Sequence, residues 1–107
     1  MNIERIDAKV LATLLKDKSP LLIDVRQSEE WHAGHIKGAT LIPLDTLPHN
    51  IQNVCPDTTQ PIYLYCRRGH RSHQAALILL SLGYQAIHEL EGGINTWIEA
   101  GYPCQSS

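Results

Sequence analysis

Short apolar runs alternate with longer segments of helical pattern along this chain, and this alternation constrains the fold more than any other feature. Short runs rich in Leu, Ile and aromatic residues are typical of strands that are buried on both faces of a sheet. Strands that alternate with helices favour right-handed crossovers between parallel neighbours. The sequence therefore predicts an α/β fold, with a small central parallel sheet flanked by helices on both faces. We predict strands over residues 21–23, 41–42, 62–65 and 86–90.

Local start and stop signals predict the helices between these strands. Asp7 can cap a first helix that ends before Pro20. The helix over residues 72–82 is apolar nearly all round, so we expect it inside the protein, with Gly83 at its C-terminal end. We predict further helices over residues 28–33, over residues 45–54 with an interruption at Pro48, and over residues 94–100.

The size and composition of the chain fit one domain that spans residues 1–107. Of the 107 residues, 43% are hydrophobic and 19% are charged, which is enough for one packed core. We find neither an apolar run of ~18 residues nor a secretory leader, so we expect a cytoplasmic protein without a membrane partner. The net charge of -2 gives no reason to propose a nucleic-acid partner, and we expect a monomer. The cysteines form no Cys-x-x-Cys pair, which fits a reducing compartment.

A basic loop between a predicted strand and a predicted helix is the strongest functional signal. Cys66 directly follows the strand, and Gly69 permits the backbone to curl closely around one point. A loop that curls into a helix start turns several backbone N–H groups toward that point, which makes an anion site. In parallel α/β sheets, ligands bind outside the carboxyl ends of the strands, where this loop lies. The basic side chains of the loop are Arg67, Arg68 and Arg71.

Cys66 is the candidate nucleophile of this loop. A helix N-terminus stabilises a negative charge by ~0.3–1 kcal/mol, and nearby guanidinium groups add Coulombic stabilisation, so both favour the thiolate. For the three arginines by themselves, the alternative interpretation is a basic loop that contacts only solvent. We interpret Cys55 and Cys104 as buried, unreactive thiols.

The histidines of the chain suggest a metal site as an alternative to the anion site. His70 and His73 lie in or beside the basic loop, and His32 lies near His35. Neither pair completes a tetrahedral ligand set, and the arginines would repel a cation, so we predict no metal. Residues 92–93 predict a tight turn and not a dinucleotide loop, because the chain has no Gly-x-Gly-x-x-Gly motif. We therefore expect no cofactor.

Two groups of motifs resemble the single-domain rhodanese-like sulfurtransferases over nearly the whole chain. The N-terminal group is Leu22-Ile23-Asp24-Val25-Arg26, Glu30, Gly34-His35-Ile36 and Gly38-Ala39. The C-terminal group is Tyr65-Cys66-x-x-Gly69-x-Arg71-Ser72, Ala75-Ala76, Leu82-Gly83-Tyr84 and Leu90-Glu91-Gly92-Gly93-x-x-x-Trp97-x-x-Ala100-Gly101-x-Pro103. Each motif is weak by itself, but their order over about eighty residues is a specific signal.

The resemblance implies an enzyme that moves sulfane sulfur from thiosulfate, or a similar donor, to a thiol or cyanide through a persulfide on Cys66. Related phosphatases carry one residue more in this loop than the six residues from Cys66 to Arg71. The shorter loop implies chemistry at sulfur and not at phosphorus. The substrate-binding residues would be Arg67, Arg68, Gly69, His70 and Arg71. Asp24 and Arg26 would support the loop structurally.

Two other functions compete with this interpretation. The first is a sulfur carrier or binding module that receives or delivers persulfide sulfur with a partner protein. The second is phosphatase or arsenate reductase chemistry on the same loop. Turnover of thiosulfate without a protein partner would discriminate between the enzyme and the carrier.

Overall fold

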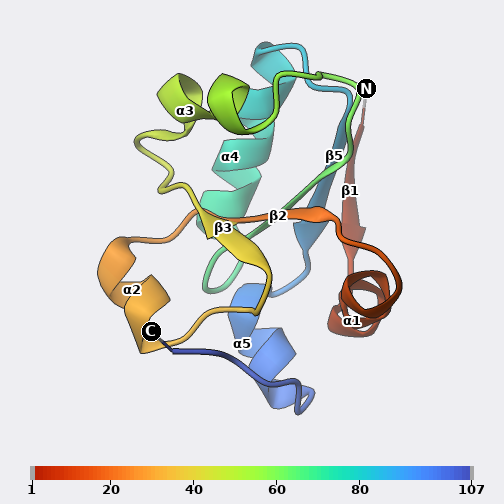
Figure 1. Cartoon of the computed structure of the whole chain (residues 1–107), viewed down its shortest axis with the longest axis vertical. Helices are drawn as coiled ribbons and strands as arrows, with labels where there is room; N and C mark the ends of the chain where they lie inside the picture. The colour runs from red at the N-terminus through yellow and green to blue at the C-terminus, as the bar shows by residue number, and fades with distance from the viewer. Residues whose placement is uncertain (1, 107) are drawn as a thin grey trace.

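The computed structural model describes residues 2–106, in which parallel strands form one sheet with helices on both faces (Figure 1). The strand order is β1-β5-β4-β2-β3, and every neighbouring pair is parallel. This architecture confirms the predicted fold class. The elements are β1 (Asn2–Ile6), α1 (Ala8–Asp17), β2 (Leu21–Asp24), α2 (Ser28–Ala33), β3 (Ala39–Leu41), α3 (Leu47–Val54), β4 (Ile62–Tyr65), α4 (His70–Ser81), β5 (Ala86–Leu90) and α5 (Gly93–Glu99).

Two apolar cores lie on opposite faces of the sheet. One core joins the sheet to α3 and α4 through side chains such as Leu64, Ile51 and Leu79. The other joins it to α1 and α5 through side chains such as Leu11 and Trp97. Successive side chains of a strand point to opposite faces, so each central strand contributes to both cores. This double burial explains why the central strands are short apolar runs.

Local signals place two helix ends as predicted. The Asp7 carboxylate accepts a hydrogen bond of 2.9 Å from the backbone N–H of Val10, which is the expected cap of α1. Gly83, with φ of 93°, follows the end of α4 in a left-handed conformation that favours glycine. None of the helices within residues 2–106 is long and apolar enough to cross a membrane.

The sequence analysis missed β1 entirely. This edge strand pairs with β5 along its length, from Asn2 opposite Ala86 to Ile6 opposite Leu90. Its sequence carries two charged residues between two isoleucines, because an edge strand needs less apolar surface than a central one. The prediction of strands from short apolar runs therefore fails at this edge of the sheet.

Three predicted elements differ in detail from the structure. Pro48 lies in the first turn of α3 and does not interrupt it, because the first turn needs no N–H donor at that position. The third strand ends at Leu41, so Ile42 lies beyond it. Helix α4 begins at His70, earlier than predicted, and its Leu77 is 51% exposed, so this helix is not buried all round.

Candidate active site

Cys66 lies at the carboxyl end of β4, immediately before the loop that leads into α4. The residue is 1% exposed, and the backbone N–H of Gly69 donates a hydrogen bond of 3.0 Å to its Sγ. Gly69 precedes α4 with φ of 115°, a conformation in the left-handed region that other residues rarely adopt. The loop therefore curls around the sulfur, and this curl depends on the glycine.

Ser72 connects the sulfur to the backbone of the same loop. Its side chain is fully buried, and Sγ of Cys66 lies 3.7 Å from its Oγ. The hydroxyl donates a hydrogen bond of 3.1 Å to the carbonyl of Gly69. The hydroxyl can rotate, so the same group can donate to a thiolate when Cys66 loses its proton. The sequence analysis did not place Ser72 in the site, although its position six residues after the cysteine, in the first turn of a helix, was a usable signal.

The N-terminus of α5 supports the loop from the other side. The backbone N–H of Ile94 donates to the carbonyl of Cys66 at 2.8 Å, and that of Asn95 donates to the carbonyl of Arg67 at 3.2 Å. Gly93 allows this approach, because a Cβ there would lie 2.4 Å from the carbonyl oxygen of Arg67. The sequence analysis interpreted Gly93 only as part of a turn and missed this contact between two loops.

Asp24 and Arg26 form a buried ion pair beneath the site. The guanidinium donates from Nη2 to Oδ2 of Asp24 at 2.7 Å and to the carbonyl of Gly34 at 2.7 Å. Burial opposes the charge of Arg26, but the hydrogen bond and the charge of Asp24 outweigh it and raise the pKa of Arg26. The guanidinium also lies over the Tyr65 ring, 5.6 Å from its centroid. These contacts join the ends of β2 and β4 to the segment after α2.

Arg71 lies in the first turn of α4 and forms a two-point ion pair with Glu30. Its Nη1 and Nη2 donate to Oε1 and Oε2 of Glu30 at 2.6 and 2.9 Å. The hydrogen bond from Arg71 lowers the pKa of the Glu30 carboxyl to about 2. This pair links α4 to α2 across 41 positions of sequence, and the sequence analysis did not anticipate it.

The remaining predicted binding residues surround an open cavity of about 320 Å³ over the sulfur. Arg67, Arg68 and His70 are exposed, and Arg71 is partly exposed beside them. The structure thus brings all the basic residues of the predicted site to one side of Cys66. Among the described residues that line this cavity none is acidic, so its surface suits a small anion.

The other cysteines and histidines have separate environments. Burial raises the pKa of the Cys55 thiol, and Cys55 donates a hydrogen bond to the carbonyl of Asp57. Cys104 is exposed, which corrects the interpretation that it is a buried thiol. The ring of His35 stacks on Trp31 and bonds to its backbone carbonyl. Among residues 2–106, no group of His, Cys, Asp or Glu side chains could hold a metal ion.

Together these contacts give the Cys66 sulfur a defined position at the base of a cationic cavity. The sulfur has a backbone N–H donor, a rotatable hydroxyl and guanidinium groups around it. Such an arrangement can hold a small anionic reactant over the sulfur. It fits covalent transfer of a group through sulfur.

The chain is similar in sequence and in fold to several known proteins. The sequence model of the rhodanese-like domain matches residues 7–100. The chain is 33% identical to the thiosulfate sulfurtransferase GlpE of Tolumonas auensis, with 87% of this chain and 86% of the relative covered. It is also 33% identical to a sulfurtransferase of Allochromatium vinosum, with 94% of each covered. The crystal structure of a rhodanese-related protein from Thermoplasma volcanium superposes with a TM-score of 0.83 at 30% identity, over 97% of this chain and 99% of that one.

Proposed function

The chain belongs to the rhodanese-like domain family, and from this premise we propose that it is a thiosulfate sulfurtransferase that works through a persulfide on Cys66. Its relatives named as sulfurtransferases support a rhodanese-type enzyme that transfers sulfur. The observation that carries the finer proposal is the position of Cys66 Sγ, which accepts the Gly69 N–H at the base of a cavity lined by arginines.

The first half of the reaction loads the enzyme. The Cys66 thiolate attacks the outer sulfur of thiosulfate, and a new sulfur–sulfur bond forms. The bond between the outer sulfur and the sulfonate sulfur breaks, and its electron pair leaves with sulfite. The exposed guanidinium groups of Arg67 and Arg68 attract the dianion, and the cavity gives it room beside His70. Arg71 lines the same cavity, and its ion pair with Glu30 fixes the position of its guanidinium group.

The second half of the reaction returns the free enzyme. An acceptor thiolate or cyanide attacks the outer sulfur of the persulfide, and the electron pair of the broken bond returns to Sγ of Cys66. The Gly69 N–H is in place to stabilise the negative charge on that sulfur. Asp24 and Arg26 act indirectly in both halves, because they fix the strand ends that flank Cys66. Two separate half-reactions predict ping-pong kinetics.

Intact mass measurement tests this proposal directly. We expect wild-type protein to gain the mass of one sulfur atom with thiosulfate and to lose it again with cyanide. Cys66→Ser should gain nothing, whereas Cys104→Ser, which removes an exposed thiol outside this cavity, should behave as wild type. A wild type that gains no sulfur would reject the thiosulfate enzyme and favour a carrier that receives sulfur from a partner protein.

A kinetic variant assigns the donor site. Arg71→Ala should raise the KM for thiosulfate, because it removes a positive charge beside Cys66. Arg5→Ala should leave that KM unchanged, because Arg5 does not line the cavity over the sulfur. An unchanged KM in Arg71→Ala would remove Arg71 from the donor site.

A further inference from the structure

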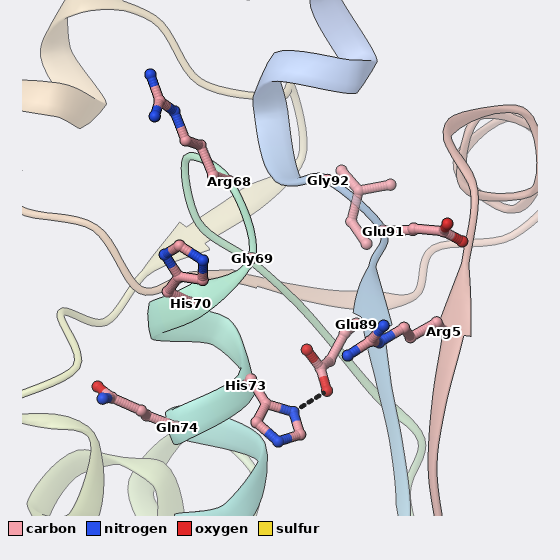
Figure 2. Close-up of a pocket in the computed structure, with 10 residues that line it drawn as sticks. Arg5, Arg68, Gly69, His70, His73, Gln74, Glu89, Glu91 and Gly92 are labelled. Carbon is pink, nitrogen blue, oxygen red and sulfur yellow. Dashed lines mark hydrogen bonds and ion pairs between the residues drawn. The ribbon is translucent and has the colours of Figure 1, made fainter.

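A second cavity, of about 460 Å³, lies beside the loop from Cys66 to Arg71, on the side of β5 (Figure 2). Its lining comes from this loop, the first turns of α4, the end of β5 and the edge strand β1. Its charged and polar side chains are Arg5, Arg68, His70, His73, Gln74, Glu89 and Glu91. The cavity is large enough for a small metabolite, because pockets for such ligands measure roughly 300–1,000 Å³.

The fold explains why this space is open. Arg5 of β1 is in register with Glu89 of β5, so both side chains project from the same face of the sheet. Helix α4 packs on this face, where its His73 contacts Glu89. Beyond α4, the edge strand carries Arg5 and not a large apolar residue, so the sheet stays uncovered there. Figure 2 shows the side chains of Arg5 and Glu89 in this space, with the loop at one side.

Glu89 is the residue that points to a ligand. It is only 3% exposed, and its Oε2 bonds to Nδ1 of His73 at 2.9 Å. Within residues 2–106, its other oxygen, Oε1, has no hydrogen-bond partner. In the same residues, every fully buried side-chain oxygen has a partner, so Oε1 is not fully buried. Oε1 is therefore reached from the cavity that Glu89 lines. A carboxylate oxygen that faces a cavity and has no protein partner favours a cationic donor.

This cavity adjoins the one over Cys66. Arg68 and His70 line both cavities, and Gly69 lies between these two residues in the sequence. Gly69 has no side chain, and a Cβ placed on it would meet nothing within 4 Å. A ligand in the second cavity can therefore extend past Gly69 toward the sulfur that the Gly69 N–H holds.

We infer that this second cavity binds the sulfur acceptor, and that the acceptor is a small thiol carrying both an ammonium and a carboxylate group. The inference rests on the proposed function and adds the acceptor class to it. The ammonium group bonds to Oε1 of Glu89. The carboxylate pairs with the guanidinium group of Arg5, which points into this space beside Glu89 (Figure 2). The thiol lies over Gly69 and faces the persulfide.

The transfer step balances without any further reactant. The acceptor loses its thiol proton to solvent, and its thiolate attacks the outer sulfur of the Cys66 persulfide. The new bond joins the acceptor sulfur to the outer sulfur. The old sulfur–sulfur bond breaks, and its electron pair returns to Cys66, which is released as thiolate. The product is a small persulfide that keeps both charged groups.

Acceptor kinetics with charged and neutral thiols test the inference. Persulfide-loaded wild type, Arg5→Ala and Glu89→Gln would react with free cysteine, which carries both charges, and with 2-mercaptoethanol, which carries neither. We expect each variant to raise the KM for cysteine about tenfold, which corresponds to the loss of ~1.4 kcal/mol of binding. The KM for 2-mercaptoethanol should change less than twofold. Lys9→Ala, which removes an exposed positive charge elsewhere, should match wild type with both thiols.

A binding measurement separates this inference from the proposed function. S-methylcysteine has the same charges but cannot accept sulfur, so its calorimetric affinity reports the cavity alone. Weaker binding to Arg5→Ala and Glu89→Gln than to wild type would support the cavity even if thiosulfate never loads Cys66. Equal affinity for the three proteins would overturn the inference, as would equal losses with both thiols, whatever the result for loading. Arg5 is exposed, so Arg5→Ala decides the question if Glu89→Gln fails to fold.

Discussion

At the residue scale, the proposed chemistry depends on the groups that hold Cys66 as much as on Cys66 itself. The thiol hydrogen-bonds to Ser72, and Ser72 donates onward to the Gly69 carbonyl, while the Gly69 N–H points back at the sulfur. In this arrangement the N–H donates to the sulfur, whereas the serine hydroxyl donates to the carbonyl. The serine hydroxyl becomes a second donor when it turns toward the thiolate, so the site can respond to the charge of the sulfur.

Ser72→Ala should slow persulfide formation about tenfold at pH 7. Hydrogen bonds to charged groups contribute ~1.5–3 kcal/mol, and the long contact to sulfur places this one at the weak end. The measurement is the single-turnover rate of sulfur loading by mass. Ser72→Thr should restore most of the rate. Ser81→Ala, which removes a hydroxyl bonded to a carbonyl at the other end of α4, should load at the wild-type rate. A normal rate in Ser72→Ala would exclude the hydroxyl from thiolate stabilisation.

The Glu30–Arg71 pair predicts a pH-dependent contribution to stability. The folded pKa of Glu30, about 2, is lowered from the ordinary 4.5, so the contribution is present above pH 4.5 and is lost as the pH falls toward 2. Both side chains are about a third exposed, which limits the contribution to ~1 kcal/mol. Urea denaturation should therefore show Glu30→Gln less stable than wild type at pH 7, with the difference shrinking by pH 2.5.

The neighbouring Glu29 provides the control for this pH dependence. Glu29→Gln removes an exposed carboxylate without breaking an ion pair recorded in the described part of the chain. Its stability should follow that of wild type at each pH. If the Glu30→Gln difference stayed constant down to pH 2.5, the lost contact would not be an ion pair.

At the scale of elements, the sequence predicts what is local and misses what depends on distant partners. Central strands, the Asp7 cap and the loop from Cys66 to Arg71 are predictable, because each carries its signal within a few residues. The strand β1 is missed because its stability comes from pairing with β5, far along the chain. The Arg71–Glu30 pair and the Gly93 contact are missed for the same reason, since only the folded sheet brings these segments together.

Gly93→Ala should damage the site through the packing of α5 on the loop. The added Cβ would lie 2.4 Å from the Arg67 carbonyl oxygen, so the loop or the helix must move. We expect a loss of ~3 kcal/mol or more in unfolding free energy, and a loss of loading rate in whatever fraction folds. Gly101→Ala is the matched control, because its φ of 88° carries similar backbone strain but nothing lies within 4 Å of the added Cβ.

The two substitutions separate steric contact from backbone strain. Both cost the strain of a left-handed alanine, of order 1–2 kcal/mol. Only Gly93→Ala should also slow the alkylation of Cys66 under conditions where the protein remains folded. Similar stability losses and normal alkylation in both variants would show that the Gly93 contact does not shape the loop.

At the scale of the whole molecule, charge is distributed unevenly although the net charge is only -2. All five arginines lie around the carboxyl ends of the strands, where they line the cavity over Cys66 or the two cavities beside it. Three of the four lysines, by contrast, line a groove between the C-terminal end of α1 and the segment after α5. Glu30, Glu89 and Glu91 line the two neighbouring cavities, but the described residues around the cavity over Cys66 include no acidic one. That cavity therefore presents a local positive field to anions, which the net charge conceals.

This field predicts that salt slows anionic reagents at Cys66 more than neutral ones. The Debye length falls from ~30 Å at 0.01 M to ~8 Å at 0.15 M ionic strength, so arginines beyond the first contact lose most of their influence. Alkylation by iodoacetate should therefore slow by about three- to tenfold over this range of sodium chloride, within the span of electrostatic rate effects. Alkylation by neutral iodoacetamide reports the reactivity of the thiolate alone and should change less than twofold. A ratio of the two rates that is independent of salt would show that the arginines beside Cys66 act only through direct contacts.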